Sequence, residues 1–159
     1  DHFNWTSVEA REVTAKKLLR QEVSYHIDKT AMGQRDQVVK LLGQGKDLNE
    51  IVKLVKDVGD AKVTTGATPL VPSNNQDGGL ASTAASLSKG GVSKPFRSTT
   101  GDGYYVVKLL EKDDDDRVSY AFLKVTLTEF DSRLKSIKSN SGITEFIDVP
   151  QIEVTLTRR

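Results

Sequence analysis

Histidine, tyrosine and aspartate are the side chains of this sequence that could move a proton or hold a polar substrate. The sequence has two histidines, His2 and His26, and no cysteine. The lack of cysteine excludes disulfide bonds, thiolate metal sites and cysteine nucleophiles. His2 lies at the end of the chain, where fraying is common, so His26 is the histidine to consider. A lone histidine is more often packed and hydrogen-bonded than catalytic, and both interpretations of His26 stay open.

Other catalytic or metal-binding patterns do not occur. The sequence has no hydrolase-like spacing of serine, histidine and aspartate, no phosphate-binding loop and no cluster of metal ligands. The acidic run 113–116 has neither the glycine nor the spaced ligands of a calcium loop. We expect a solvated turn there, and we expect no metal ion and no cofactor.

Segments rich in β-branched and aromatic residues predict the strands that would position these side chains. Residues 103–111 form an unbroken run of this kind, bounded by Gly101-Asp102-Gly103 and by the aspartates. Large apolar groups on both faces are typical of a central strand. Residues 118–127 predict a second strand, and the alternation over 152–156 predicts a half-buried strand near the C-terminus.

Helices are expected between and around these strands. The capping box Thr6-Ser7-Val8-Glu9 begins a helix over 6–21, and residues 22–27, with His26, then form a short predicted strand. Further helices are predicted at 30–43, at 47–58, weakly at 80–87, and from 128 onward. Residues 59–80 are rich in turn-forming residues and lack apolar periodicity. We expect a long loop, with 59–79 the most mobile internal segment.

Two short stretches echo each other. Val23-Ser24-Tyr25 and Val118-Ser119-Tyr120 are each followed four residues later by a lysine and then by a predicted helix. Chance can explain so short a match. Alternatively, a second, incomplete copy of a strand–helix unit begins at Arg117.

Length and charge restrict the class of protein. The chain has 159 residues, of which 28% are charged and 36% apolar, and its net charge is +1. These values fit one soluble domain, alone or with an appendage, and give no reason to expect nucleic acid or an anionic membrane as partner. No run reaches the length of a membrane helix, and no signal peptide is present. Because Asp1 is not a natural start, we expect an export or anchor segment upstream.

Five short motifs follow one another over residues 22–112. They are Val23-Ser24-Tyr25-His26-Ile27, Gly45-Lys46-Asp47-Leu48-Asn49-Glu50-Ile51, Asp77-Gly78-Gly79-Leu80, Gly90-Gly91-Val92-Ser93-Lys94-Pro95 and Gly103-Tyr104-Tyr105-Val106-Val107-Lys108. Their order and spacing are more specific than any one of them. Taken together, they resemble the parvulin (rotamase) family of prolyl cis/trans isomerases.

The resemblance implies a fold. We expect an α+β domain over 22–112, in which helices surround a four-stranded antiparallel sheet. Before this domain we expect an N-terminal helix over 1–21, which is part of a flanking chaperone-like region. After it we expect a C-terminal strand–helix–strand extension over 117–159. The strands 22–27 and 103–110 should be neighbours in the sheet.

The resemblance also implies site residues. His26 matches the first of two family histidines, the second falls on Tyr105, and an acidic position lies near Asp57, Val58 or Asp60. Tyr105 also suits a core position, and Asp57 the end of a helix. The methionine and phenylalanine that line the family's proline pocket have no counterpart in 80–88, so the pocket is trimmed. Substrate contacts are expected from Leu80, Phe96, Tyr104 and Phe122.

Three functions follow as hypotheses. In the first, the chain is a prolyl isomerase with a degenerate site and weak activity, within an exported (periplasmic or extracellular) folding factor. In the second, it is a non-catalytic chaperone module that binds peptides. A third alternative is an adhesion or assembly domain of similar topology. The first two imply unfolded or extended polypeptides as partners, no nucleic acid, no small-molecule cofactor, and any membrane anchor outside this sequence.

Overall fold

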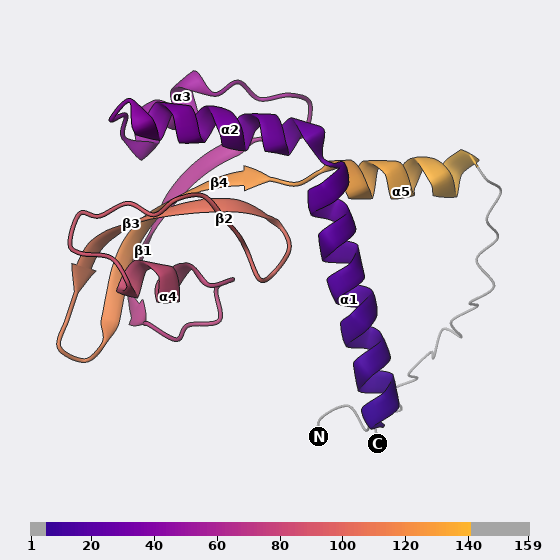
Figure 1. Ribbon diagram of the computed structural model, residues 1–159, viewed down its shortest axis with the longest axis horizontal. Coiled ribbons are helices and arrows are strands. Elements are labelled where there is room, and N and C mark those ends of the chain that lie inside the picture. Colours follow the sequence, from indigo (N-terminus) through magenta and orange to yellow (C-terminus); the bar gives the residue numbers. More distant parts are fainter. Residues whose placement is uncertain (1–5, 141–159) are drawn as a thin grey trace, which may run out of the picture.

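A four-stranded antiparallel sheet forms the centre of the computed structural model, which describes residues 6–140 (Figure 1). The strand order is β1-β4-β3-β2, and within the described residues five helices accompany the sheet, so the α+β class is confirmed. The strands are β1 (Val63–Pro72), β2 (Phe96–Arg97), β3 (Gly103–Lys112) and β4 (Arg117–Thr126). The helices are α1 (Ser7–Ile27), α2 (Lys29–Gly43), α3 (Leu48–Leu54), α4 (Leu80–Ala85) and α5 (Glu129–Asn140).

Strand β3 lies inside the sheet, as its two apolar faces predict. It pairs with β4 over nearly its whole length and with the short β2 on its other side. The acidic turn joins β3 to β4. Asp113 Oδ1 accepts from the backbone N–H of Arg117 at 2.9 Å, and Asp116 has a left-handed φ of 56°, which aspartate tolerates better than most residues. The expected turn is therefore present.

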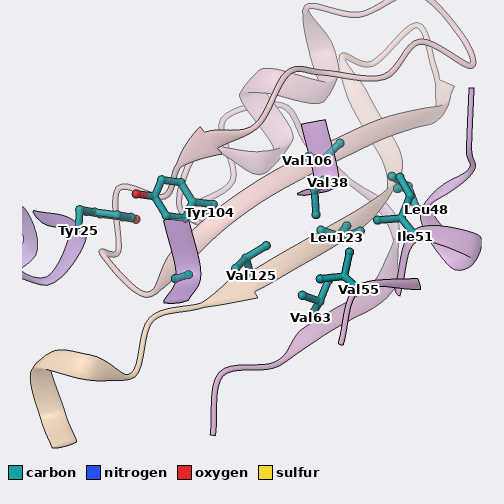
Figure 2. Packing of buried hydrophobic residues seen from close by; sticks show 11 residues of the cluster. Tyr25, Val38, Leu48, Ile51, Val55, Val63, Tyr104, Val106, Leu123 and Val125 are labelled. Atoms are coloured by element: carbon teal, nitrogen blue, oxygen red, sulfur yellow. The ribbon is translucent and has the colours of Figure 1, made fainter. Parts of the chain in front are cut away.

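One face of the sheet is covered by α2 and α3, with the end of α1 at one edge. Figure 2 shows Val38 and Ile51 beside Val106 and Leu123, and Tyr25 facing Tyr104. All six side chains are almost completely buried. This cluster holds the first three helices against β3 and β4 by apolar burial.

The opposite face is covered by α4. The small residues Ala81 and Ala84 are fully buried, which lets this short helix approach β3 and β4 closely. Asp77 fixes its beginning, because its Oδ1 accepts from Leu80 N at 2.8 Å and its Oδ2 from Tyr120 Oη at 2.7 Å. The weak helix expected at 80–87 is thus present as α4.

Residues 22–27 form helix and not the expected strand. Helix α1 begins at the Thr6–Glu9 capping box, runs without a break to Ile27 and ends where Asp28 caps α2. Val23, Tyr25 and Ile27 favour a strand locally. Tyr25 gains more as a helical residue, because its ring packs edge-on against Tyr104 and its hydroxyl donates to Gly103 O at 2.7 Å. Tertiary contacts of this kind outweigh a weak local preference.

The expected loop 59–80 is wrong over almost half of its length, because residues 63–72 form β1. This strand pairs with β4 from Val63 to Pro72, with an irregular register between Thr68 and Val71. It is an edge strand with mostly exposed side chains, so it needs no apolar periodicity. The other predicted helices are present, and the strand expected at 152–156 lies outside the described residues.

Strand β4, which lies in the expected C-terminal extension, is an interior strand of the sheet, between β1 and β3. Helices α1 and α5 extend away from the sheet on one side (Figure 1), and Arg20 NH2 forms an ion pair with Asp131 Oδ1 at 2.7 Å between them. Within residues 6–140, no helix has both the length and the apolar character needed to cross a membrane.

Candidate functional site

Three aromatic side chains form a partly exposed patch on the α4 face of the sheet. Phe96 of β2, Tyr105 of β3 and Phe122 of β4 lie side by side, with ring centroids 6.4 Å apart for Phe96–Tyr105 and 6.1 Å for Tyr105–Phe122. Tyr105 is 8% exposed, whereas the two phenylalanines are half-buried. We call Phe96, Tyr105 and Phe122 the aromatic patch.

A polar network borders the patch. Asp102 Oδ2 accepts from Tyr105 Oη at 2.8 Å and from Lys124 Nζ at 2.5 Å, and its Oδ1 accepts from Thr100 Oγ1 at 2.6 Å. The ammonium of Lys124 also lies 5.6 Å from the centre of the Tyr105 ring, a cation–π arrangement. The network therefore holds the Tyr105 hydroxyl in one orientation.

The network does not suit proton transfer at neutral pH. Burial tends to raise the pKa of Asp102, but hydrogen bonds from Lys124, Thr100 and Tyr105 outweigh it and lower that pKa to about 2. Burial and the hydrogen bond to Asp102 raise the pKa of Tyr105. At pH 7 the carboxylate is ionised and the phenol protonated, so the pair is fixed and polar, without a group poised to exchange a proton.

His26 does not belong to this site. It lies exposed in the last turn of α1, and the residue before it, Tyr25, packs against Tyr104 on the opposite face of the sheet from Tyr105. No hydrogen bond or ring contact joins His26 to Tyr105 in the described part of the chain. The expected pairing of these residues on adjacent strands is wrong, because β3 lies between β4 and β2 and residues 22–27 are part of helix α1.

The other expected site residues lie in three different parts of the fold. Asp57 is exposed after α3, and its Oδ1 accepts from Val63 N at 3.4 Å, so it holds the start of β1. Leu80, Phe96 and Phe122 gather with Tyr105 in one cluster. Tyr104 belongs to the cluster on the other face, because successive strand residues point to opposite faces.

The outer edge of β1 borders the patch. Phe122 lies directly over Gly66 of β1, so closely that a Cβ at Gly66 would come within 2.6 Å of Phe122 Cζ. Thr126 N donates to Lys62 O, and hydrogen-bonded pairs alternate along an antiparallel ladder. Gly66 therefore bonds to β4, while the backbone groups of Thr65 and Ala67 point away from the sheet.

Sequence reasoning missed Asp102, Lys124 and Gly66 as parts of this region. Signals for two of them were present. Asp102 lies between two glycines just before a strong strand, and Lys124 follows Phe122 at the two-residue spacing that places both on one strand face. Gly66 lay in the segment taken for a loop.

Comparison with known proteins gave no match. No protein-family model matches the chain, and no curated protein or solved structure matches it either. The parvulin resemblance therefore rests on the sequence motifs alone. Within residues 6–140, no group of three or more histidine, aspartate or glutamate side chains is placed to hold a metal ion.

Proposed function

We propose that this chain is a parvulin-like module of a protein-folding factor that binds extended or unfolded polypeptides without catalysing prolyl isomerisation. The observation that carries the proposal is the contact of Phe122 with Gly66. It makes the aromatic patch continuous with the free edge of β1. An extended chain added to that edge would run alongside the patch.

The edge of β1 supplies backbone recognition. The strand is ten residues long and pairs only with β4 in the described sheet. The outward N–H and C=O groups of Thr65 and Ala67 can accept a further strand, a recognised mode of peptide binding. Pro69 and the irregularity after Thr68 limit this to the first half of the strand.

The aromatic patch supplies side-chain recognition. Phe96 and Phe122 are half-buried, so each ring keeps one part available to a proline ring or another apolar group. Tyr105 is held by its hydrogen bond to Asp102, and its ring lies beside both phenylalanine rings. Leu80 lies in the same cluster, so three of the four substrate-contact positions that the resemblance implies are close together.

Catalysis has less support. Lowering the rotation barrier of about 20 kcal/mol requires groups that favour the twisted imide. His26 is exposed on α1 and makes no hydrogen bond or ring contact with Tyr105 in the described residues, and the Tyr105 hydroxyl is already donated to Asp102. We therefore infer binding without isomerisation. An exported folding factor remains our proposal for the context, on the strength of the motif resemblance.

Peptide addition at β1 can be tested with Ala67→Pro. Proline removes the outward N–H of Ala67 without removing a bond to β4, and edge strands tolerate it. We expect the variant to keep its circular dichroism spectrum and to lose binding of a fluorescent, proline-containing, unfolded peptide. The matched control is Ala67→Thr, which keeps the N–H and should bind as the wild type does.

Amide exchange gives a second measurement. Peptide addition should slow exchange at Thr65 and Ala67, and Phe122→Ser should weaken binding in parallel. If both amides exchange equally fast with and without bound peptide, binding does not use this edge and the proposal fails.

A further inference from the structure

A groove on the α2 side of the molecule, away from the aromatic patch, has the properties of a second binding site. Its cavity volume is about 850 Å³. One wall is a continuous face of α2 from Thr30 to Gln44, about 21 Å long at 1.5 Å per residue. The other wall is the segment after α3, with Leu54, Lys56 and Val58.

The charges along the groove have one sign. Its lining includes Lys29, Lys40 and Lys56 and no acidic residue. All three lysines are exposed, and within residues 6–140 none of them forms an ion pair. The groove therefore favours an acidic ligand by charge complementarity.

Apolar side chains lie between these lysines. Leu54 and Val58 are 54% and 56% exposed, and Leu41 is half-buried on the facing helix. An anion such as free phosphate would leave these groups in water. A polypeptide segment that alternates acidic and apolar side chains would cover them and pair with the lysines.

The floor of the groove has an unmatched hydrogen-bond acceptor. Gln34 is 3% exposed, and its Nε2 donates to Lys56 O at 3.0 Å and to Ala61 O at 3.2 Å. Two carbonyl acceptors fix the orientation of the amide, which leaves Oε1 buried and without a donor in the described residues. Because this oxygen has almost no accessible surface, a ligand lying in the groove would contact other atoms of Gln34 and not Oε1.

Gly33 has no side chain to project from α2 into the groove. A Cβ at this position would have no heavy atom within 4 Å, so packing does not require glycine there. Glycine inside a helix is less favourable than alanine by about 1 kcal/mol. Its position in the groove lets the backbone of a ligand approach α2 closely.

We propose that the groove between α2 and residues 54–58 binds an acidic, partly apolar segment of another polypeptide. Its apolar side chains rest on Leu41, Leu54 and Val58, and its carboxylates pair with the lysines. This site is separate from β1 and does not depend on the function proposed for that edge.

The test is a titration of the protein with a synthetic peptide of alternating leucine and glutamate, followed by NMR. We expect shifts of the Gln34 side-chain amide signals and of the Gly33 backbone amide, and binding that weakens with added salt. The same peptide with glutamine in place of glutamate should bind at least about tenfold more weakly, a difference of about 1.4 kcal/mol.

Variants locate the site. Gly33→Trp should fill the groove and abolish binding while preserving α2, because its side chain meets open space. The double change Lys40→Glu with Lys56→Glu should weaken binding at least about tenfold. The matched charge control is the double change Lys89→Glu with Lys135→Glu, at two exposed positions outside the groove, which should bind as the wild type does.

Several results would overturn the proposal. They are unchanged binding in Gly33→Trp, equal binding of the neutral peptide, no shift at Gln34, or tighter binding of a single-stranded oligonucleotide at the same residues. Loss of binding in Ala67→Pro would assign the peptide to β1 instead. Failure of the β1 proposal alone would leave the groove results unaffected.

Discussion

At the scale of single residues, Asp102 connects three side chains of the aromatic region. Tyr105, Lys124 and Thr100 all donate to its carboxylate, and together they lower its pKa to about 2 from the ordinary 3.8. A carboxyl whose pKa is lower in the folded state stabilises the fold when ionised. Its contribution is complete above the unfolded pKa and is lost as the pH falls through the folded value.

We therefore expect part of the stability of the protein to disappear between about pH 4 and pH 2 through Asp102. Urea unfolding at a series of pH values should show a shallower decline over this range in Asp102→Asn than in the wild type. Carboxyl NMR supplies the check: an Asp102 titration at the ordinary pKa would contradict the expectation.

Tyr104 and Tyr105 form a natural matched pair. They are neighbours on β3, but Tyr105 donates to Asp102 whereas the buried Tyr104 hydroxyl has no partner in the described residues. Tyr105→Phe should lower the free energy of unfolding by about 1–2 kcal/mol, because a hydrogen bond to a charged group is lost. Tyr104→Phe should change it by less than about 0.5 kcal/mol or increase it. Equal losses of unfolding free energy in the two variants would show that the Tyr105–Asp102 hydrogen bond does not specifically stabilise the fold.

At the scale of elements, one carboxylate connects three helices. Asp28 follows α1 and is 1% exposed. Its Oδ1 accepts from Ala31 N at 2.8 Å, at the beginning of α2, and its Oδ2 accepts from Thr128 N at 2.8 Å and Glu129 N at 3.1 Å, at the beginning of α5. These bonds satisfy N–H groups that have no partner inside their own helices.

Asp28→Ala should therefore lower the free energy of unfolding by about 3 kcal/mol, since it removes an N-cap and leaves further buried N–H groups unpaired. Asp36→Ala is the control, because Asp36 is exposed on α2 and pairs with Arg35 at the surface, where the effect should stay below about 0.5 kcal/mol. Chemical denaturation of both variants measures the difference. A loss in Asp28→Ala no larger than in the control would exclude the double-capping role.

At the scale of the whole molecule, the arrangement of the two sheet faces separates binding from catalysis. The α4 face holds Tyr105 and the phenylalanines, and the end of α1, with His26, docks through Tyr25 on the other face. The motif positions that the resemblance assigns to two catalytic histidines therefore do not share a cleft.

We expect prolyl-peptide isomerisation at the uncatalysed rate, together with suppression of aggregation of an unfolded client. Truncating an aromatic wall alone can remove about 3–5 kcal/mol of buried contact, and each 1.36 kcal/mol of lost transition-state binding is about tenfold in rate. His26→Ala is the informative variant and should change neither measurement. A rate comparable to that of an intact parvulin, abolished by His26→Ala, would contradict both the site assignment and the proposed function.

The sequence by itself determined the elements whose signals are local. The Thr6–Glu9 and Asp47–Glu50 pairs begin helices as predicted, and the β-branched run of β3 with its acidic turn forms a central strand. These features depend on neighbouring residues: a side-chain cap needs an acceptor and a donor three positions apart, and a buried strand needs apolar groups on both faces. Of the four substrate contacts that the resemblance implied, Leu80, Phe96 and Phe122 lie in one cluster and Tyr104 lies in the cluster on the other face.

Only the tertiary structure decided the secondary structure of residues 22–27 and of residues 63–72. Residues 22–27 stay helical because Tyr25 contacts Tyr104 and Gly103, which lie far along the chain. Residues 63–72 form an edge strand because they pair with β4, and their exposed side chains give no periodic signal in the sequence. Both outcomes depend on partners about 45–80 residues away along the chain, which no local pattern contains. The same long-range pairing separates His26 from Tyr105 and brings Gly66 beneath Phe122, because strand neighbours are chosen by burial across the whole sheet.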